Sequence, residues 1–221
     1  MIKSITENRE AILNSLMKKS LNFTIIDPGT NCSFRYVRIW IDNGSILSQT
    51  LGHFFFKGSS AGANFIERMS MLSKNLGQEV LFCTSDYYII EEQFENNVYI
   101  SVGVLIGIIS NLRCNSVQTR LKARSAVATP CDMPYQIYSI PCYFKTRILE
   151  QYSSITGDLK LKAVEAAVKL CESTGDTNTV ALMNSVIQSH DIADTVCYQK
   201  ALIMFLSSAN NIQKTKFKYK T

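Results

Sequence analysis

Asn22-Phe-Thr-Ile-Ile-Asp-Pro-Gly-Thr30 is a short apolar, β-branched run that ends abruptly at Asp27. The run predicts a buried strand, and Pro28 and Gly29 end it where the carboxylate emerges. A carboxylate at the end of a buried strand costs free energy unless a positive group meets it. Asp also starts turns well, so Asp27 indicates a site only if other acids share its position.

The composition is that of an ordinary globular protein. The chain has 221 residues, of which 46% are hydrophobic and 19% charged, with a formal net charge of +5. These values exclude a disordered or fibrous chain and allow one substantial core or at most two small domains. Because the net charge is mild, its distribution matters more than its total.

The cysteines and apolar runs predict an intracellular protein without a membrane partner. Seven cysteines are scattered without C-x-x-C spacing, which favours reduced thiols in a reducing compartment. The two histidines are not grouped with cysteines, which argues against a structural zinc site. Residues 1–20 carry both signs of charge and predict no targeting segment. The longest largely apolar run, residues 98–109, is far shorter than the roughly 20 residues that span a bilayer.

Strand and helix patterns alternate in the first half of the chain. Residues 22–27, 34–41 and 45–56 predict three antiparallel strands, with a hairpin turn at Asn43-Gly44 and a bulge or break at Gly52. Residues 61–82 predict a helix that Gly77 ends or kinks. Residues 87–90 predict a strand that ends in carboxylate, and the helical crossover can lay it parallel to the first strand.

The remaining segments are mostly helical. Residues 98–112 predict an apolar helix in which Gly103 and Gly107 allow close packing on the sheet, and residues 116–127 a fifth strand or extended segment. Residues 159–171, 179–188 and 189 onward predict helices, the last capped by Ser189 or Asp191. Residues 5–17 predict an amphipathic helix that packs against the body or a second subunit.

Two more acids join the strand ends on the last helix. Asp191 and Asp194 stand three positions apart, so both point to one side, although the helix dipole alone would favour acids there. If the two acidic strand ends are neighbours and this helix packs beside them, four carboxylates converge. They repel one another unless a cation holds them, and oxygen ligands select Mg²⁺ or Mn²⁺. Two such ions roughly 4 Å apart support phosphodiester hydrolysis.

The ordered set of motifs resembles the RuvC-like Holliday junction resolvases of the RNase H/integrase superfamily, and is most similar to their poxvirus-type viral branch. The resemblance covers roughly residues 20–207 and is carried by Ile-Asp27-Pro-Gly, Ile-Ile-Glu91-Glu-Gln93, Leu159-Lys-Leu-Lys-Ala-Val-Glu-Ala166 and Asp191-Ile-Ala-Asp194. The segment from Pro130 to Tyr143 departs from the pattern and resembles an insertion.

The fold implied by the resemblance is α/β, with an RNase H-like mixed five-stranded sheet of three antiparallel and then two parallel strands, flanked by helices. Residues 1–20 would be an N-terminal helical extension, 21–208 the nuclease domain and 209–221 a basic tail.

The resemblance also implies a site. The metal ligands would be Asp27, Glu91, Asp191 and Asp194, holding two Mg²⁺ ions that Mn²⁺ can replace, with no small-molecule cofactor. Glu92 is the alternative to Glu91, because strand alternation lets only one of them face the site. The viral spacing, with Tyr99 following, favours Glu91.

Basic side chains offer contacts to nucleic acid. The resemblance places Lys160 and Lys162 beside the scissile phosphate, where they would stabilise developing charge. A second set would extend the DNA surface and comprises Arg120, Lys122, Arg124, Lys214, Lys216 and Lys218, with Phe217 and Tyr219 available for stacking. The alternatives are a solvated edge strand and a solubilising tail. His190 assists the metal site or is only a neighbour of the helix cap.

The function implied is an Mg²⁺-dependent endonuclease, a crossover junction endodeoxyribonuclease that resolves four-way DNA junctions by paired symmetric cuts as a homodimer. The viral branch would place it in the cytoplasm of an infected cell. The alternatives are another nuclease of the superfamily, acting on RNA–DNA hybrids or flaps, and a catalytically inactive module that binds branched DNA.

Overall fold

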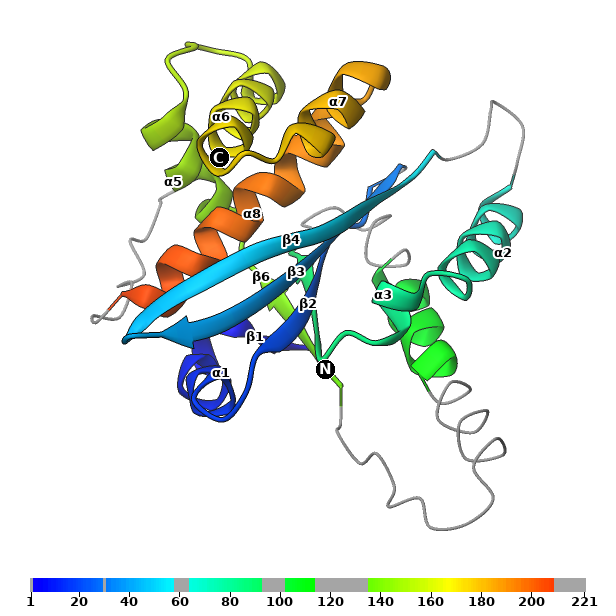
Figure 1. The fold of residues 1–221 in the computed structure, drawn as a ribbon. Helices are drawn as coiled ribbons and strands as arrows, with labels where there is room; N and C mark the ends of the chain where they lie inside the picture. The colour runs from blue at the N-terminus through cyan, green and yellow to red at the C-terminus, as the bar shows by residue number, and fades with distance from the viewer. Residues whose placement is uncertain (1, 30, 58–63, 93–101, 114–134, 209–221) are drawn as a thin grey trace, which may run out of the picture.

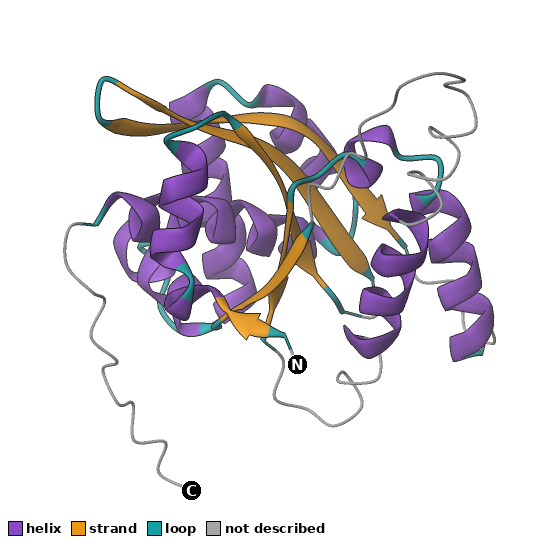
Figure 2. Cartoon of the chain, turned by 90° about the horizontal axis from the view of Figure 1, so that it is seen from below, coloured by secondary structure: helices purple, strands orange, loops and turns teal. Residues whose placement is uncertain are grey.

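A six-stranded mixed sheet lies at the centre of the computed structural model, which describes residues 2–29, 31–57, 64–92, 102–113 and 135–208 (Figure 1). Its strand order is β1-β6-β5-β2-β3-β4. Helices cover both faces of the twisted sheet (Figure 2). None of the helices in the described ranges is long and apolar enough to cross a membrane.

The first three long strands are antiparallel, as predicted. They are β2 (Leu21–Asp27), β3 (Cys32–Asp42) and β4 (Ser45–Phe56). Asn43 and Gly44 both have positive φ, 48° and 76°, which is the backbone of a tight hairpin turn. Tyr36 pairs with Gly52 and Val37 with Thr50, so the predicted bulge lies beside Gly52.

A helical crossover brings the next strand parallel to the first. The helix α2 (Phe65–Leu76) begins with a capping box between Asn64 and Glu67, and ends at Gly77 as predicted. After the short α3 (Val80–Cys83), β5 (Tyr87–Glu91) pairs in parallel with β2. The carboxyl ends of β2 and β5 therefore lie side by side.

The fifth long strand is β6 (Gln136–Ile140), which pairs in parallel with β5. It lies within the segment from Pro130 to Tyr143, so treating that whole segment as an insertion was wrong. Unlike β5, which is equally short, this strand carries polar Gln136 and Ser139 among its apolar residues, and Pro134 and Pro141 on either side obscure the pattern. Residues 116–127 lie outside the described residues.

The strand order β4-β3-β2-β5-β6 is the predicted RNase H-like arrangement, three antiparallel strands followed by two parallel ones. A two-residue strand, β1 (Lys3–Ser4), adds a sixth member beside β6.

The N-terminal segment packs into the main core. After β1 come a 3-10 turn, η1 (Ile5–Glu7), and α1 (Arg9–Leu16), and Ile5 and Ile12 are fully buried. The guanidinium of Arg9 donates to the carbonyls of Phe205 (3.0 Å) and Leu206 (2.8 Å) near the end of the last helix. This segment and the last helix therefore share one hydrophobic core.

Two helical layers bury the two faces of the sheet. On one face lie α5 (Tyr143–Tyr152), α6 (Leu159–Thr174), α7 (Thr177–Ser185) and α8 (Ser189–Ser207). On the other lie α2, α3 and the helical residues 102–113. Along β2, Ile25 faces the α8 layer and Ile26 the α2 layer, as strand alternation requires.

Two predictions about helices were wrong. Gly103 and Gly107 face outward with no atom near the space of a Cβ, because Leu105, Ile108 and Ile109 form the buried face of their helix. The N-cap of α8 is Gln188, without a side-chain cap, and neither Ser189 nor Asp191 caps it.

A buried ion pair fastens α7 to the sheet. Arg35 on β3 is 2% exposed and donates to Asp176 Oδ2 (2.7 Å), Thr179 Oγ1 (2.9 Å) and Thr50 Oγ1 (2.9 Å). Asp176 also caps α7 by accepting from the Thr179 backbone N–H (3.2 Å). Burial raises the pKa of Asp176, but Arg35 and the hydrogen bonds outweigh it, and the net pKa is lowered.

Arg35→Ala is expected to lower the free energy of unfolding by about 3–5 kcal/mol, because it leaves a partly buried carboxylate without its partner. Arg38→Ala on the same strand is the matched control, since Arg38 is exposed and donates to Asn22 Oδ1 at 3.2 Å. Its loss should be about 0.5 kcal/mol or less. Urea unfolding of both variants measures the difference, and equal losses would contradict the bracing role of Arg35.

Candidate active site

The alternation of β2 and β5 decides which acids meet. Ile25 and Ile89 face the α8 layer, so Asp27 and Glu91, two residues further along each strand, face it as well. Glu92 has the opposite parity, and its carboxylate accepts from Ser139 Oγ (2.8 Å). The structure therefore places Glu91, rather than Glu92, beside Asp27.

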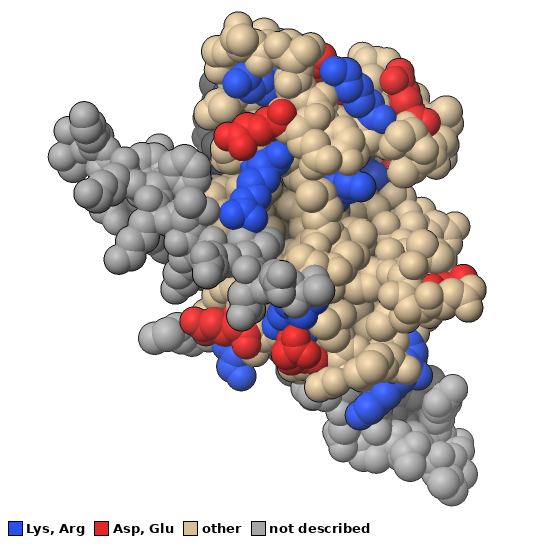
Figure 3. Space-filling model, turned by 90° about the vertical axis from the view of Figure 1, so that its left-hand side faces the viewer, with Lys and Arg blue, Asp and Glu red and all other residues tan. Residues whose placement is uncertain are grey.

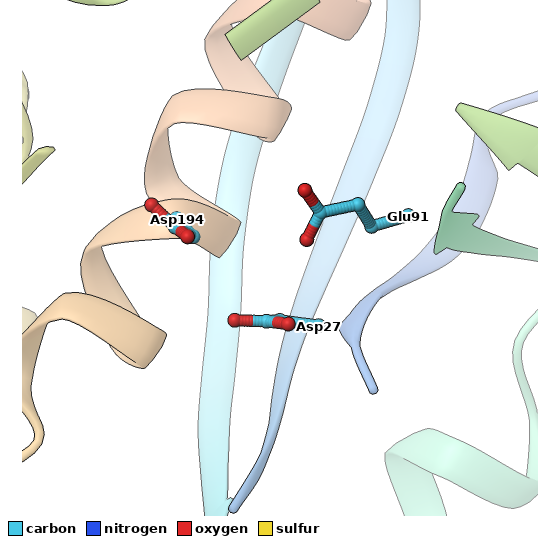
Figure 4. Close-up of side chains that lie close together, drawn as sticks. All are labelled: Asp27, Glu91 and Asp194. Carbon is cyan, nitrogen blue, oxygen red and sulfur yellow. The ribbon is translucent and has the colours of Figure 1, made fainter. Parts of the chain in front are cut away.

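Asp194 completes the group from α8. One carboxylate oxygen from each of Asp27, Glu91 and Asp194 lies within 4.8 Å of the others. Figure 4 shows the three carboxylates pointing toward one another from two strands and a helix. Asp27 is 6% and Glu91 7% exposed, so the group is nearly closed to solvent on the sheet side.

Asp191 lies one turn earlier on α8 and is not in this closest group. Its Oδ2 accepts from Asn31 Nδ2 (3.3 Å), and its Oδ1 lies 3.1 Å from His190 Nε2. Its negative charge nevertheless contributes to raising the pKa of Asp27, so it belongs to the same electrostatic neighbourhood. Burial raises the pKa of Asp191 itself, although His190 opposes this.

Two of the three grouped carboxylates, Asp27 and Asp194, ionise reluctantly. Burial, followed by the charges of Glu91 and Asp194, raises the pKa of Asp27 well above its usual value. Burial also raises the pKa of Asp194, although Lys145 opposes it. In the metal-free protein, Asp27 and Asp194 therefore hold protons above the ordinary range of an aspartate even with Lys145 beside them.

Two residues that sequence reasoning missed complete the site. Lys145 on α5 places Nζ 2.6 Å from Asp194 Oδ2 and 3.3 Å from Glu91 Oε1. Tyr198 donates its hydroxyl to Glu91 Oε1 (2.5 Å), and its ring centre lies 5.4 Å from Lys145 Nζ. Tyr198 stands four positions after Asp194, so helical spacing could have found it. Lys145 lies outside every motif, and no sequence signal marks it.

Burial and neighbouring charge have opposite effects on the pKa of Lys145 but act in the same direction on the pKa of Tyr198. Burial alone would lower the pKa of Lys145, but Asp194 and Glu91 raise it, and the net pKa is raised. Burial and then Glu91 raise the pKa of Tyr198 well above its usual value. Lys145 is therefore held as an ammonium and Tyr198 as a neutral donor.

Where the structure describes them, the basic residues predicted to contact DNA do not contact the grouped acids as Lys145 does. Lys160 is exposed at the start of α6 and acts on the pKa of Asp191 through its charge, while Lys162 is half-buried. Neither forms an ion pair with the acids in the described part of the chain. Arg120, Lys122, Arg124, Lys214, Lys216 and Lys218 lie outside the described residues, as does Tyr99. On the face shown in Figure 3, Lys and Arg are interspersed with Asp and Glu.

The donor set fits a hard divalent cation. The group is made of carboxylate oxygens from three elements and contains no sulfur or nitrogen ligand. Buried carboxylates with raised pKa values gain most from a bound cation, and oxygen donors of this kind suit Mg²⁺ or Mn²⁺. The arrangement is therefore chemically suited to metal-assisted hydrolysis.

Several solved structures are similar to this chain. The structure of Thermus thermophilus RuvC shares 14% identity, with a TM-score of 0.48, over 83% of this chain and 96% of that one. T. thermophilus RuvC in complex with a Holliday junction substrate shares 12%, with a TM-score of 0.49, over 84% and 94%. The yeast mitochondrial Holliday junction resolvase Ydc2 shares 14%, with a TM-score of 0.47, over 91% and 90%. No protein-family model and no curated protein matches the chain.

Asp27→Asn is expected to stabilise the metal-free protein at neutral pH. Because folding raises the pKa of Asp27, the folded state binds this proton more tightly than the unfolded chain does. The stability of the wild type therefore falls as the pH rises from about 3.9, the pKa of an unfolded Asp, through the higher folded pKa. Asn carries no charge and avoids this loss.

Urea unfolding in EDTA measures this effect. At neutral pH, Asp27→Asn should exceed the wild type by on the order of 1 kcal/mol, and the gain should shrink toward pH 4 or so. Glu92→Gln is the matched control, since it removes a carboxylate outside the group and should give no such gain. A variant less stable than the wild type at neutral pH would contradict the raised pKa of Asp27 in the folded protein.

Proposed function

We propose that this chain is a metal-dependent endonuclease that cuts four-way DNA junctions. The observation that carries the proposal is the convergence of Asp27, Glu91 and Asp194 at the carboxyl edge of an RNase H-like sheet. A buried all-oxygen group in which Asp27 and Asp194 have raised pKa values is costly to keep, and such costs are typical of functional sites.

The acids would hold two divalent ions, which activate water and stabilise the leaving oxygen in phosphodiester hydrolysis. Asp27, Glu91 and Asp194 would be the principal ligands, with Asp191 as the outer one. Tyr198 fixes the orientation of Glu91 through its hydroxyl (2.5 Å), and Asn31 orients Asp191 (3.3 Å). Such supporting contacts keep ligand oxygens in position.

The remaining chain would supply the nucleic-acid surface. Lys160 is close enough to lower the pKa of Asp191 through its charge, and it would neutralise a phosphate beside the acids. Lys162, two residues further along α6, would contribute a second positive charge. Arg120, Lys122, Arg124 and the lysines of residues 209–221 would extend that surface. The nuclease domain would comprise residues 21–208, with residues 1–20 as an extension that packs into its core and residues 209–221 as its tail.

Symmetric cleavage of two strands requires two sites, so the proposal includes a homodimer. Ile66 (77% exposed) and Val80 (72% exposed) on α2 and α3 are apolar surface that a second subunit would cover. They lie on the helical layer opposite α8, so pairing there would leave the acids accessible. The spacing of the acidic motifs supports the proposal that this nuclease belongs to the viral branch. Its site of action would then be intracellular.

A cleavage assay tests the activity. The wild type should cut a synthetic four-way junction with Mg²⁺ and not with EDTA, while Asp27→Asn and Glu91→Gln should each lose about 100-fold or more in rate. Glu92→Gln should retain most activity, because the Glu92 carboxylate accepts from Ser139 and lies outside the group of acids. Loss of cutting in Glu92→Gln but not in Glu91→Gln would overturn the assignment of the site.

The same assay separates the alternatives. Preference for an RNA–DNA hybrid or a flap over the junction would indicate a different nuclease of RNase H-like fold. No metal-dependent cutting by the wild type, together with junction binding unchanged in Asp27→Asn, would indicate a structural branched-DNA module. Cutting lost but binding retained in Asp27→Asn supports catalysis.

A further inference from the structure

Lys145 places a positive charge where the acids would otherwise need a metal ion. Its Nζ lies 2.6 Å from Asp194 Oδ2 and 3.3 Å from Glu91 Oε1. Both acids belong to the group whose oxygens lie within 4.8 Å of one another. In the metal-free protein, the cation that bridges Glu91 and Asp194 is therefore a side chain of α5.

Two carboxylates and an aromatic ring surround the ammonium. Nζ contacts Asp194 and Glu91, and the centre of the Tyr198 ring lies 5.4 Å from Nζ. The Tyr198 hydroxyl donates to the same Glu91 oxygen that Lys145 contacts. Glu91 Oε1 therefore already accepts two donors, which leaves it little capacity for a further partner.

A divalent ion and this ammonium would compete for the same oxygens. Mg²⁺ binds carboxylate oxygens at about 2.0–2.1 Å, so an ion between Glu91 and Asp194 would need the space that Nζ fills. Two positive charges so close would also repel each other. A divalent ion that bridges Glu91 Oε1 and Asp194 Oδ2 would therefore displace the ammonium from them.

We propose that Lys145 is a resident cation that holds Glu91 and Asp194 together in the metal-free protein and leaves them when a divalent ion binds. This rests on the proposed metal site and adds an exchange step to it. Lys145 neutralises part of the repulsion among the acids, and metal binding replaces one cation by another.

Exposure and flexibility decide which partner moves. The Lys145 side chain is 20% exposed, and a lysine has a flexible four-carbon stem that can swing toward solvent. Tyr198 is fully buried and stays on Glu91. The acids therefore keep their arrangement while the ammonium departs, at the cost of a weaker apparent affinity for metal.

Amine labelling of the wild type tests the exchange without a substitution. Acetylation of lysines, followed by mass spectrometry, is compared in EDTA and in saturating Mg²⁺. Lys145 should be labelled several-fold faster with Mg²⁺, whereas Lys169, which pairs with Glu165 on α6, should not change. Unchanged or slower labelling of Lys145 in Mg²⁺ would overturn the exchange.

Mn²⁺ titration of Lys145→Met provides a second measurement. Removing the competing charge should tighten Mn²⁺ binding about tenfold or more, which is the lower end of the coupling energies between close charges. It should also lower the Tm of the metal-free protein, because the acids lose the ammonium between them. Lys169→Met is the matched control and should bind Mn²⁺ as the wild type does.

The outcomes separate this inference from the proposed function. Equal or weaker Mn²⁺ binding by Lys145→Met than by a wild type that binds Mn²⁺ overturns the exchange and leaves the metal site standing. Absence of Mn²⁺ binding in both proteins overturns the metal site and the exchange together. If Lys145→Met does not fold, the labelling of the wild type decides.

Discussion

Repulsion among three buried carboxylates is the constraint on which this structure depends. Asp27, Glu91 and Asp194 would separate if they stood on flexible segments, because like charges at this distance repel, and the charges of Glu91 and Asp194 raise the pKa of Asp27. The chain places two of them on paired parallel strands and the third on a long buried helix. Rigid elements keep the three acids together despite their repulsion, which flexible loops would not do.

The rest of the fold keeps those elements in place. The helix α8 is buried along most of its length, and Arg9 fastens its end to the N-terminal segment. The Arg35–Asp176 pair holds α7, which precedes α8, against β3. Lys145 and Tyr198 act at the acids themselves, one through charge and one through a hydrogen bond. The site and its scaffold are thus one connected arrangement.

Sequence patterns predicted the parts of this arrangement that depend on short-range periodicity. The buried strand β2 and the turn at Asn43-Gly44 follow from residues near one another in the chain. Patterns failed where partners are distant or the signal is interrupted. Prolines flank β6, and Gly103 and Gly107 face outward because Leu105 and Ile109 define the buried face.

The amino-acid sequence by itself determined which residues end the strands as acids and that Asp191 and Asp194 share one side of a helix. It also determined the order of the elements that carry them. Only the tertiary structure decided that Glu91 rather than Glu92 faces Asp27, and that Lys145 supplies the bridging cation. The physical reason is that alternation along a strand sends Glu91 and Glu92 to opposite faces of the sheet, and only the packing of the helices shows which face carries Asp27 and Asp194. A charge from α5 likewise reaches the acids only through long-range packing.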